Sequence, residues 1–250
     1  MNFKNLFTKN RRDKEISEIK EIKDVKQDQV DANIIATKRI EEIIKKREEI
    51  SGAEFDKGYN LIKKYPLSVS ILGSARFDEN NIYYKKAQSL AYNIVKKLGY
   101  AIVTGGGPGI MEAANRGAYE AKGASLGFSI KLPKEQKNNK YLTEYVEFEY
   151  FSSRKTLLFF SAEAYVYFPG GFGTFDELFE ILTLIQTGKM VKTPVILVGK
   201  EFWTPFLDLF KQKLSTEYNT ISVEDTEIYK IVDSEDEIID IIKKAPYIEE

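Results

Sequence analysis

Two different patterns of hydrophobic and polar positions divide this chain. Over residues 1–65 the chain is rich in charge, and isoleucines recur three or four residues apart, as at Ile40 and Ile43. Residues at this spacing share one face of a helix, so the pattern predicts one or two amphipathic helices. Pro66 favours a boundary. We therefore expect a helical extension at residues 1–65, followed by one domain at residues 66–250.

From residue 67 onward, short apolar runs alternate with helical patterns. The expected strands lie near residues 67–72, 100–103, 124–130, 146–150, 164–168, 194–199 and 228–232. The expected helices lie near residues 82–98, 111–122, 152–162, 178–185, 202–214 and 236–244. This strict alternation predicts an α/β fold: a Rossmann-like, doubly wound parallel sheet with helices on both faces. Such sheets bind their ligands at the carboxyl ends of the strands.

The N-terminal extension has two interpretations. It packs on the main domain or across a dimer, or it is a helix that binds a partner or a membrane surface. Its charges are mixed in sign, which argues against an anionic membrane.

Composition excludes several classes of function. The net charge is −1, so nucleic acid is not an expected partner. The chain has neither cysteine nor histidine, which removes thiolate metal sites and the usual neutral-pH proton shuttle, and we expect no metal. No apolar run is long enough to cross a bilayer, so we expect a cytoplasmic protein without membrane partners. Any catalysis must use carboxylates, Arg, Lys, Tyr or backbone groups.

Two glycine loops follow predicted strands, at residues 105–109 and 170–173. Thr174 is a candidate cap for the helix after the second loop. A strand, a glycine loop and a helix N-terminus together can bind a phosphate, so we expect one shared nucleotide or sugar-phosphate site. Neither loop fits the dinucleotide fingerprint, and no Walker motif is present. Asp176 and Glu177, expected in the first helical turn, would repel a phosphate, which indicates chemistry on the group that the phosphate carries.

Arg154 and Lys155 fall at the start of a predicted helix, where the helix dipole disfavours cations. They either reach the surface or pair with nearby acids, or they bind an anion, for which Arg offers bidentate recognition. Glu177 has a simpler interpretation as a charge that complements the helix dipole. By composition alone, Glu135 is an ordinary loop acid.

Several motifs occur together. PGGFGTFDE at residues 169–177 matches the PGGxGTxxE signature of the Lonely Guy (LOG) family, and Arg154 and Lys155 fall where that family carries its Arg-Lys pair. GSAR, GGGPGIMEAAN and LPKEQ resemble matching segments of bacterial members. The resemblance covers about residues 67–214.

The resemblance implies a phosphoribohydrolase, which cleaves the N-glycosidic bond of a nucleoside 5′-monophosphate such as AMP or a cytokinin riboside monophosphate. The products are the free base and ribose 5-phosphate. It also implies a homodimer or higher homo-oligomer, with parts of both subunits near the site. Some members carried the label of lysine decarboxylase, but nothing in this sequence resembles a pyridoxal phosphate site, and we expect no cofactor.

Carried over residue by residue, the resemblance makes Arg154 and Glu177 the catalytic pair. The expected phosphate cradle is Gly170, Gly171, Gly173 and Thr174. Further expected substrate contacts are Gly73, Ser74, Gly106, Gly107, Glu135, Lys155 and Thr183. A carboxylate at Glu177 would stabilise the oxocarbenium-like transition state of glycosidic cleavage, and Arg154 would keep it ionised.

Two other functions are open on the sequence. One is a nucleotide-binding or sensor module of the same fold without turnover. The other is a transferase that moves the ribosyl group to a second base.

Overall fold

A computed structural model describes residues 3–132 and 137–245, with side chains described from residue 33 onward. The chain divides into two compact units, Met1–Ile50 and Ser51–Glu250. Helix α1 (Phe3–Lys64) supplies the first unit and continues into the second. The extension is thus one continuous helix rather than two, and Pro66 separates it from the first strand.

The second unit is built on a sheet of seven strands, all paired in parallel, in the order β4-β3-β2-β1-β5-β6-β7. The strands are β1 (Ser68–Leu72), β2 (Ala101–Thr104), β3 (Ser125–Ile130), β4 (Glu144–Phe148), β5 (Ala164–Tyr167), β6 (Val195–Leu197) and β7 (Tyr229–Ile231). The predicted doubly wound, Rossmann-like fold is confirmed.

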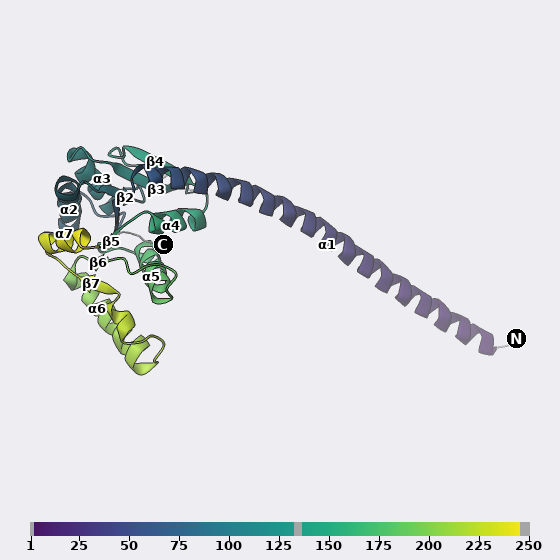
Figure 1. Ribbon diagram of the computed structural model, residues 1–250. Coiled ribbons are helices and arrows are strands. Elements are labelled where there is room, and N and C mark those ends of the chain that lie inside the picture. The colour runs from purple at the N-terminus through teal and green to yellow at the C-terminus, as the bar shows by residue number, and fades with distance from the viewer. Residues whose placement is uncertain (1–2, 133–136, 246–250) are drawn as a thin grey trace. The chain divides into compact units, whose positions relative to one another are not determined.

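Helices cover both faces of this sheet because its central strands are apolar on both sides. In β5, Tyr165 and Tyr167 point to one helical layer and Val166 points to the other. Helices α4, α5 and α6 and the end of α1 cover the first face, and α2, α3 and α7 cover the second (Figure 1). Their bounds are α2 (Ile82–Leu98), α3 (Ile110–Glu120), α4 (Phe151–Phe160), α5 (Phe172–Gln186), α6 (Lys200–Phe210) and α7 (Glu235–Lys243).

Local sequence explains where several of these helices begin and end. Asn81 caps α2, because its side chain accepts a hydrogen bond from the N–H of Tyr83 at 2.8 Å. Gly99 ends α2 in a left-handed conformation with φ of 73°, as its position in the sequence predicts. The helix expected at 202–214 is α6, which continues into a π-helix at Lys211–Glu217.

The start of α5 differs from the sequence-based expectation. The helix begins at Phe172 with Gly171 as its N-cap, so Thr174 is not the cap and already lies in the first turn. Asp176 and Glu177 therefore lie beyond the first turn, which contains no acidic residue. The reason is that Thr174 is buried and packs against Gly170, where a Cβ atom would overlap the threonine side chain.

The strand order changes direction between β1 and β5. Strands β1 to β4 extend to one side, and β5 then returns to pair with the other edge of β1. The loops that follow these two strands diverge and leave a crevice, which is where doubly wound sheets bind ligands. The N–H of Ser74 donates to the carbonyl of Pro169 at 3.0 Å, so the two loops are joined at their base. In the described part of the chain, no helix has the length and apolar character needed to cross a membrane.

Candidate active site

A cleft of about 800 Å³ lies over the carboxyl ends of β1 and β5. It is lined by the loops after these strands and by residues from the beginnings of α4 and α5. Its volume is within the range of about 300–1,000 Å³ that is usual for small-molecule sites. Of the described residues that line it, only Arg76, Arg154 and Glu177 carry a charge.

The N-terminus of α5 opens into this cleft. Gly170, Gly171, Gly173 and Thr174 all line the cleft, and no described side chain caps the helix. The first N–H groups of a helix have no partner within the helix, and they lie at the positive end of its dipole. This end of α5 therefore offers backbone donors to an anion in the cleft.

The glycines of this loop serve different purposes. Gly170 leaves room for Thr174, as described above. At Gly171 and Gly173, an added Cβ atom would meet nothing within 4 Å, and neither residue has a positive φ. Neither the backbone conformation nor the packing of the chain itself therefore requires glycine at these two positions. The space they leave is open to a molecule in the cleft.

The second glycine loop is held by the protein itself. The carbonyls of Gly106 and Gly107 each accept a hydrogen bond from Asn139 Nδ2 at 3.1 Å. Asn139 Nδ2 also donates to the side chain of the fully buried Asn115, at 2.9 Å. Of this loop, Gly105 is among the described residues that line the cleft, and Gly106 and Gly107 are not. Sequence reasoning missed both asparagines, although Asn115 is a polar residue on the buried face of α3.

Arg154 and Glu177 form a buried ion pair across α4 and α5. Arg154 Nη1 lies 3.0 Å from Glu177 Oε1, with side-chain exposures of 9% and 13%. Arg154 Nε also donates to the carbonyl of Phe128 at 2.8 Å, which ties the guanidinium to β3. A Cβ atom on Gly105 would lie only 2.7 Å from Arg154 Nη2, so glycine is needed there for the guanidinium to fit.

Burial raises the pKa of Glu177 above its ordinary value of 4.5, and the nearby Arg154 opposes this shift. The backbone carbonyl of Glu177 accepts a hydrogen bond from the hydroxyl of Tyr167 at 3.1 Å. Burial raises the pKa of Tyr167 well above its usual range, so this tyrosine stays a neutral donor. The turn that carries Glu177 is thereby fixed to the neighbouring strand.

Lys155 pairs with two acids of α5 that are not among the described residues lining the cleft. It lies 3.0 Å from Asp176 Oδ2 and also bonds to Glu180. Both cations of the Arg-Lys pair therefore have partners on α5, which is the simpler of the two interpretations of the sequence. Lys155 is not among the residues that line the cleft.

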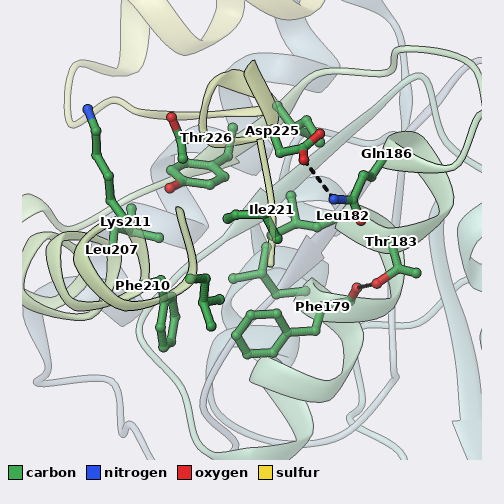
Figure 2. Close-up of a pocket in the computed structure, with 14 residues that line it drawn as sticks. Phe179, Leu182, Thr183, Gln186, Leu207, Phe210, Lys211, Ile221, Asp225 and Thr226 are labelled. Carbon is green, nitrogen blue, oxygen red and sulfur yellow. Dashed lines mark hydrogen bonds between the residues drawn. The ribbon is translucent and has the colours of Figure 1, made fainter. Parts of the chain in front are cut away.

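The remaining residues that the sequence predicts to contact the substrate do not all lie at the cleft. Gly73 and Ser74 line the cleft. Thr183 lies on α5 beside a second, apolar cavity of about 120 Å³, where Gln186 bonds to Asp225 (Figure 2). Glu135 lies outside the described residues. Among the residues that the structure describes, no three acidic side chains gather closely enough to hold a metal ion.

The fold and the cleft define a doubly wound α/β protein with a glycine loop and an open helix N-terminus at its topological switch point. Residues 111–242, more than half of the chain, match the family model described as possible lysine decarboxylase. The chain belongs to this family, the LOG family.

Two named relatives, each with a low sequence identity to this chain, support this assignment. The cytokinin riboside 5′-monophosphate phosphoribohydrolase LOG2 of Arabidopsis thaliana is 27% identical over 126 residues, which are 50% of this chain and 59% of that protein. The chain thus matches less than two thirds of that relative's length. The cytokinin riboside 5′-monophosphate phosphoribohydrolase of Rhodococcoides fascians is 26% identical over 146 residues, which are 57% of this chain and 73% of that protein.

Solved structures support the fold. The X-ray structure of TM1055 superposes with a TM-score of 0.51 at 25% identity, covering 71% of this chain and 99% of that one. The molybdenum cofactor carrier protein of Chlamydomonas reinhardtii superposes with a TM-score of 0.53 at 22% identity, covering 72% of this chain and 97% of that one. At that identity the second match shows the fold alone.

Proposed function

We propose that this protein hydrolyses the N-glycosidic bond of a nucleoside 5′-monophosphate, AMP or a cytokinin riboside 5′-monophosphate. The observation that supports this most is the buried pair of Arg154 and Glu177 beside an uncapped helix N-terminus, in a cleft with no other described carboxylate. The names of the Arabidopsis and Rhodococcoides relatives point to the same substrate class.

The helix geometry relates the phosphate to the carboxylate. Glu177 follows Gly173 by four residues and Thr174 by three, so these positions share one face of α5, about one turn or 5.4 Å apart. Side chains of a helix lean toward its N-terminus, so Glu177 leans back toward the open backbone N–H groups. A phosphate bound at those groups would place its ribose beside the carboxylate. Binding energy from the phosphate would then position the bond that breaks.

Glu177 has a direct role in the proposed reaction. As the bond between C1′ and the base breaks, positive charge develops on the ribose, and the carboxylate stabilises it. Glu177 also orients a water molecule for attack on C1′ and accepts its proton. The hydroxyl group of the water goes to C1′, and the proton that Glu177 accepts is returned through solvent to the base, which gives ribose 5-phosphate, the free base and the ionised carboxylate.

Arg154 has a supporting electrostatic role. Burial alone favours the neutral carboxyl of Glu177, and Arg154 lowers its pKa back toward the ionised form that the reaction needs. Its Nη1 contact fixes the orientation of the carboxylate, while the bond from Nε to Phe128 fixes the guanidinium itself.

The test is release of ribose 5-phosphate and adenine from AMP by the purified protein. Glu177→Gln and Arg154→Ala should each abolish release while the far-ultraviolet circular dichroism spectrum stays that of the wild type. Turnover that persists in either variant would exclude the assigned roles. AMP binding without product would favour a binding module, and transfer of ribose to an added second base would favour a transferase.

A homodimer or larger homo-oligomer, which the family resemblance implies, is part of the same proposal. Phe172 at the mouth of the cleft is 97% exposed, and Phe151 at the start of α4 is 52% exposed. Large apolar side chains at the edge of a cleft favour coverage by another protein surface. A second copy of the chain at this edge would shield the reacting ribose from bulk water.

A further inference from the structure

The end of α1 packs along α4, the helix that carries Arg154. Glu54 and Gly58, one turn apart on α1, contact Ser153 and Leu157, one turn apart on α4. A Cβ atom on Gly58 would overlap the side chain of Leu157, so the two helices approach each other closely here. All of these residues belong to the compact unit Ser51–Glu250.

Glu54 is a buried carboxylate, 6% exposed, that binds the beginning of α4. One of its oxygens accepts a hydrogen bond from the backbone N–H of Glu149, and the other accepts from the hydroxyl of Ser153. The N-cap of α4 is Tyr150, which makes no capping bond, and the first turn of α4 has no acidic residue. Glu54 therefore supplies, from a distant part of the chain, the anion that the N-terminus of α4 lacks.

Other contacts fix the same part of α1 around this point. The ring of Tyr59 meets that of Phe160, the last residue of α4, edge to face at 5.6 Å between centroids. Lys64 and Tyr65 both bond to Glu144 on β4. The end of α1 thus contacts α4 at both of its ends and the neighbouring edge strand. None of the LOG motifs includes any of these α1 residues.

We propose that Glu54 is a positioning residue for Arg154. Ser153 directly precedes Arg154, so the bonds of Glu54 hold the turn from which the guanidinium reaches Phe128 and Glu177. A displacement of about 1 Å in a positioned catalytic group can reduce the rate about a hundredfold. This inference rests on the proposed function, in which Arg154 orients the reacting carboxylate.

The test compares Glu54→Ala, Glu54→Gln and Ser153→Ala with the control Glu49→Ala, an exposed glutamate of the same helix. We expect Glu54→Ala to lower kcat for AMP about tenfold, with KM within about twofold, because the phosphate-binding end of α5 is untouched. Glu54→Gln, which keeps the shape and one acceptor, should recover to within about threefold. If Glu54→Ala does not fold, Ser153→Ala tests the same contact. It removes the hydroxyl that bonds to Glu54 and to the carbonyl of Tyr150, and it should lower kcat about threefold. The control should match the wild type.

Kinetics measured well below each melting temperature separate positioning from mere stability. A Glu54→Ala protein with a lower melting temperature and an unchanged kcat would overturn the proposal. So would an unchanged kcat in Ser153→Ala.

A second readout does not depend on turnover. If the wild type releases no ribose 5-phosphate, the proposed function fails, but the Nε–H of Arg154 can still be followed by NMR in arginine-labelled protein. Its resonance is assigned by its loss in Arg154→Lys. Since this N–H is buried and bonded to Phe128, its hydrogen exchange should be slow and should accelerate at least tenfold in Glu54→Ala. An unchanged exchange rate would overturn the positioning role on its own.

Discussion

Gly105→Ala places one methyl group against the guanidinium of Arg154. The new Cβ atom would lie 2.7 Å from Arg154 Nη2 and 2.8 Å from Met111 Sδ, both closer than a normal contact. Gly105 has no positive φ, so the backbone accepts alanine and the conflict is one of space alone. The thioether of Met111 can change rotamer, but Arg154 is held by Phe128 and Glu177. The methyl group must therefore strain or break one of these bonds.

The expected size of the effect follows from that geometry. Forcing an extra methyl group into a well-packed site costs about 1–3 kcal/mol, and loss of the ion pair would bring the figure to the upper end or beyond. We expect the free energy of unfolding to fall by about 2 kcal/mol, which lowers the melting temperature by roughly 4–8 °C. A displaced guanidinium should also lower kcat for AMP by about 10- to 100-fold.

Urea unfolding and initial-rate kinetics measure the two effects of Gly105→Ala. The control is Gly52→Ala, at an exposed helical position where a Cβ atom meets nothing within 4 Å. The double variant Gly105→Ala/Met111→Ala removes the contact with sulfur and leaves the one with Arg154. If the double variant regains wild-type kcat, or if Gly105→Ala never loses it, the argument that the methyl group displaces Arg154 is wrong.

Two further predictions concern the same cleft. Gly173→Ala adds a methyl group in open space near the start of α5, so stability should be unchanged or should rise by up to about 1 kcal/mol. The KM for AMP should nevertheless increase at least tenfold, and a wild-type KM would mean that the phosphate binds elsewhere. The pH profile of kcat/KM should rise through a pKa above 4.5, because burial favours the neutral form of Glu177 and the reaction needs its carboxylate. An acidic limb of this profile at or below pH 4.5 would contradict the assignment. Because the pKa of Glu177 is higher in the folded than in the unfolded chain, its contribution to the free energy of unfolding is full below pH 4.5 and declines as the pH rises through the raised pKa.

Patterns within single segments allowed most of the fold to be predicted from the sequence. The apolar runs that became β1 and β5 are short and flanked by glycine or proline, and the strict alternation left few topologies to consider. The start of α5 was predicted less well. Thr174 has a hydroxyl that could cap a helix, but its side chain is buried in the space beside Gly170. Only the three-dimensional structure shows that space.

Contacts between segments far apart in the sequence limited how much of the candidate site could be predicted. Lys155 binds Asp176 only because α4 and α5 lie side by side, and no local pattern encodes that distance. Glu54 reads in the sequence like Glu48 and Glu49, one charge among many on a polar helix, yet it alone of the three is buried. The structural role of Asn115 could have been predicted, because a polar side chain on the buried face of a helix requires hydrogen-bond partners in the core.

The ion pairing of α4 with α5 has a consequence for selectivity among cellular anions. With Arg154 neutralised by Glu177, Arg76 is the other cation among the described residues that line the cleft, so an anion at the start of α5 would meet mainly fixed peptide dipoles. Dipoles act over short range and reward only a group that fits against them, whereas free cations would draw in phosphates and carboxylates of every shape. Discrimination at the start of α5 would then rest mainly on steric fit, and anions of another shape would compete poorly for the same place.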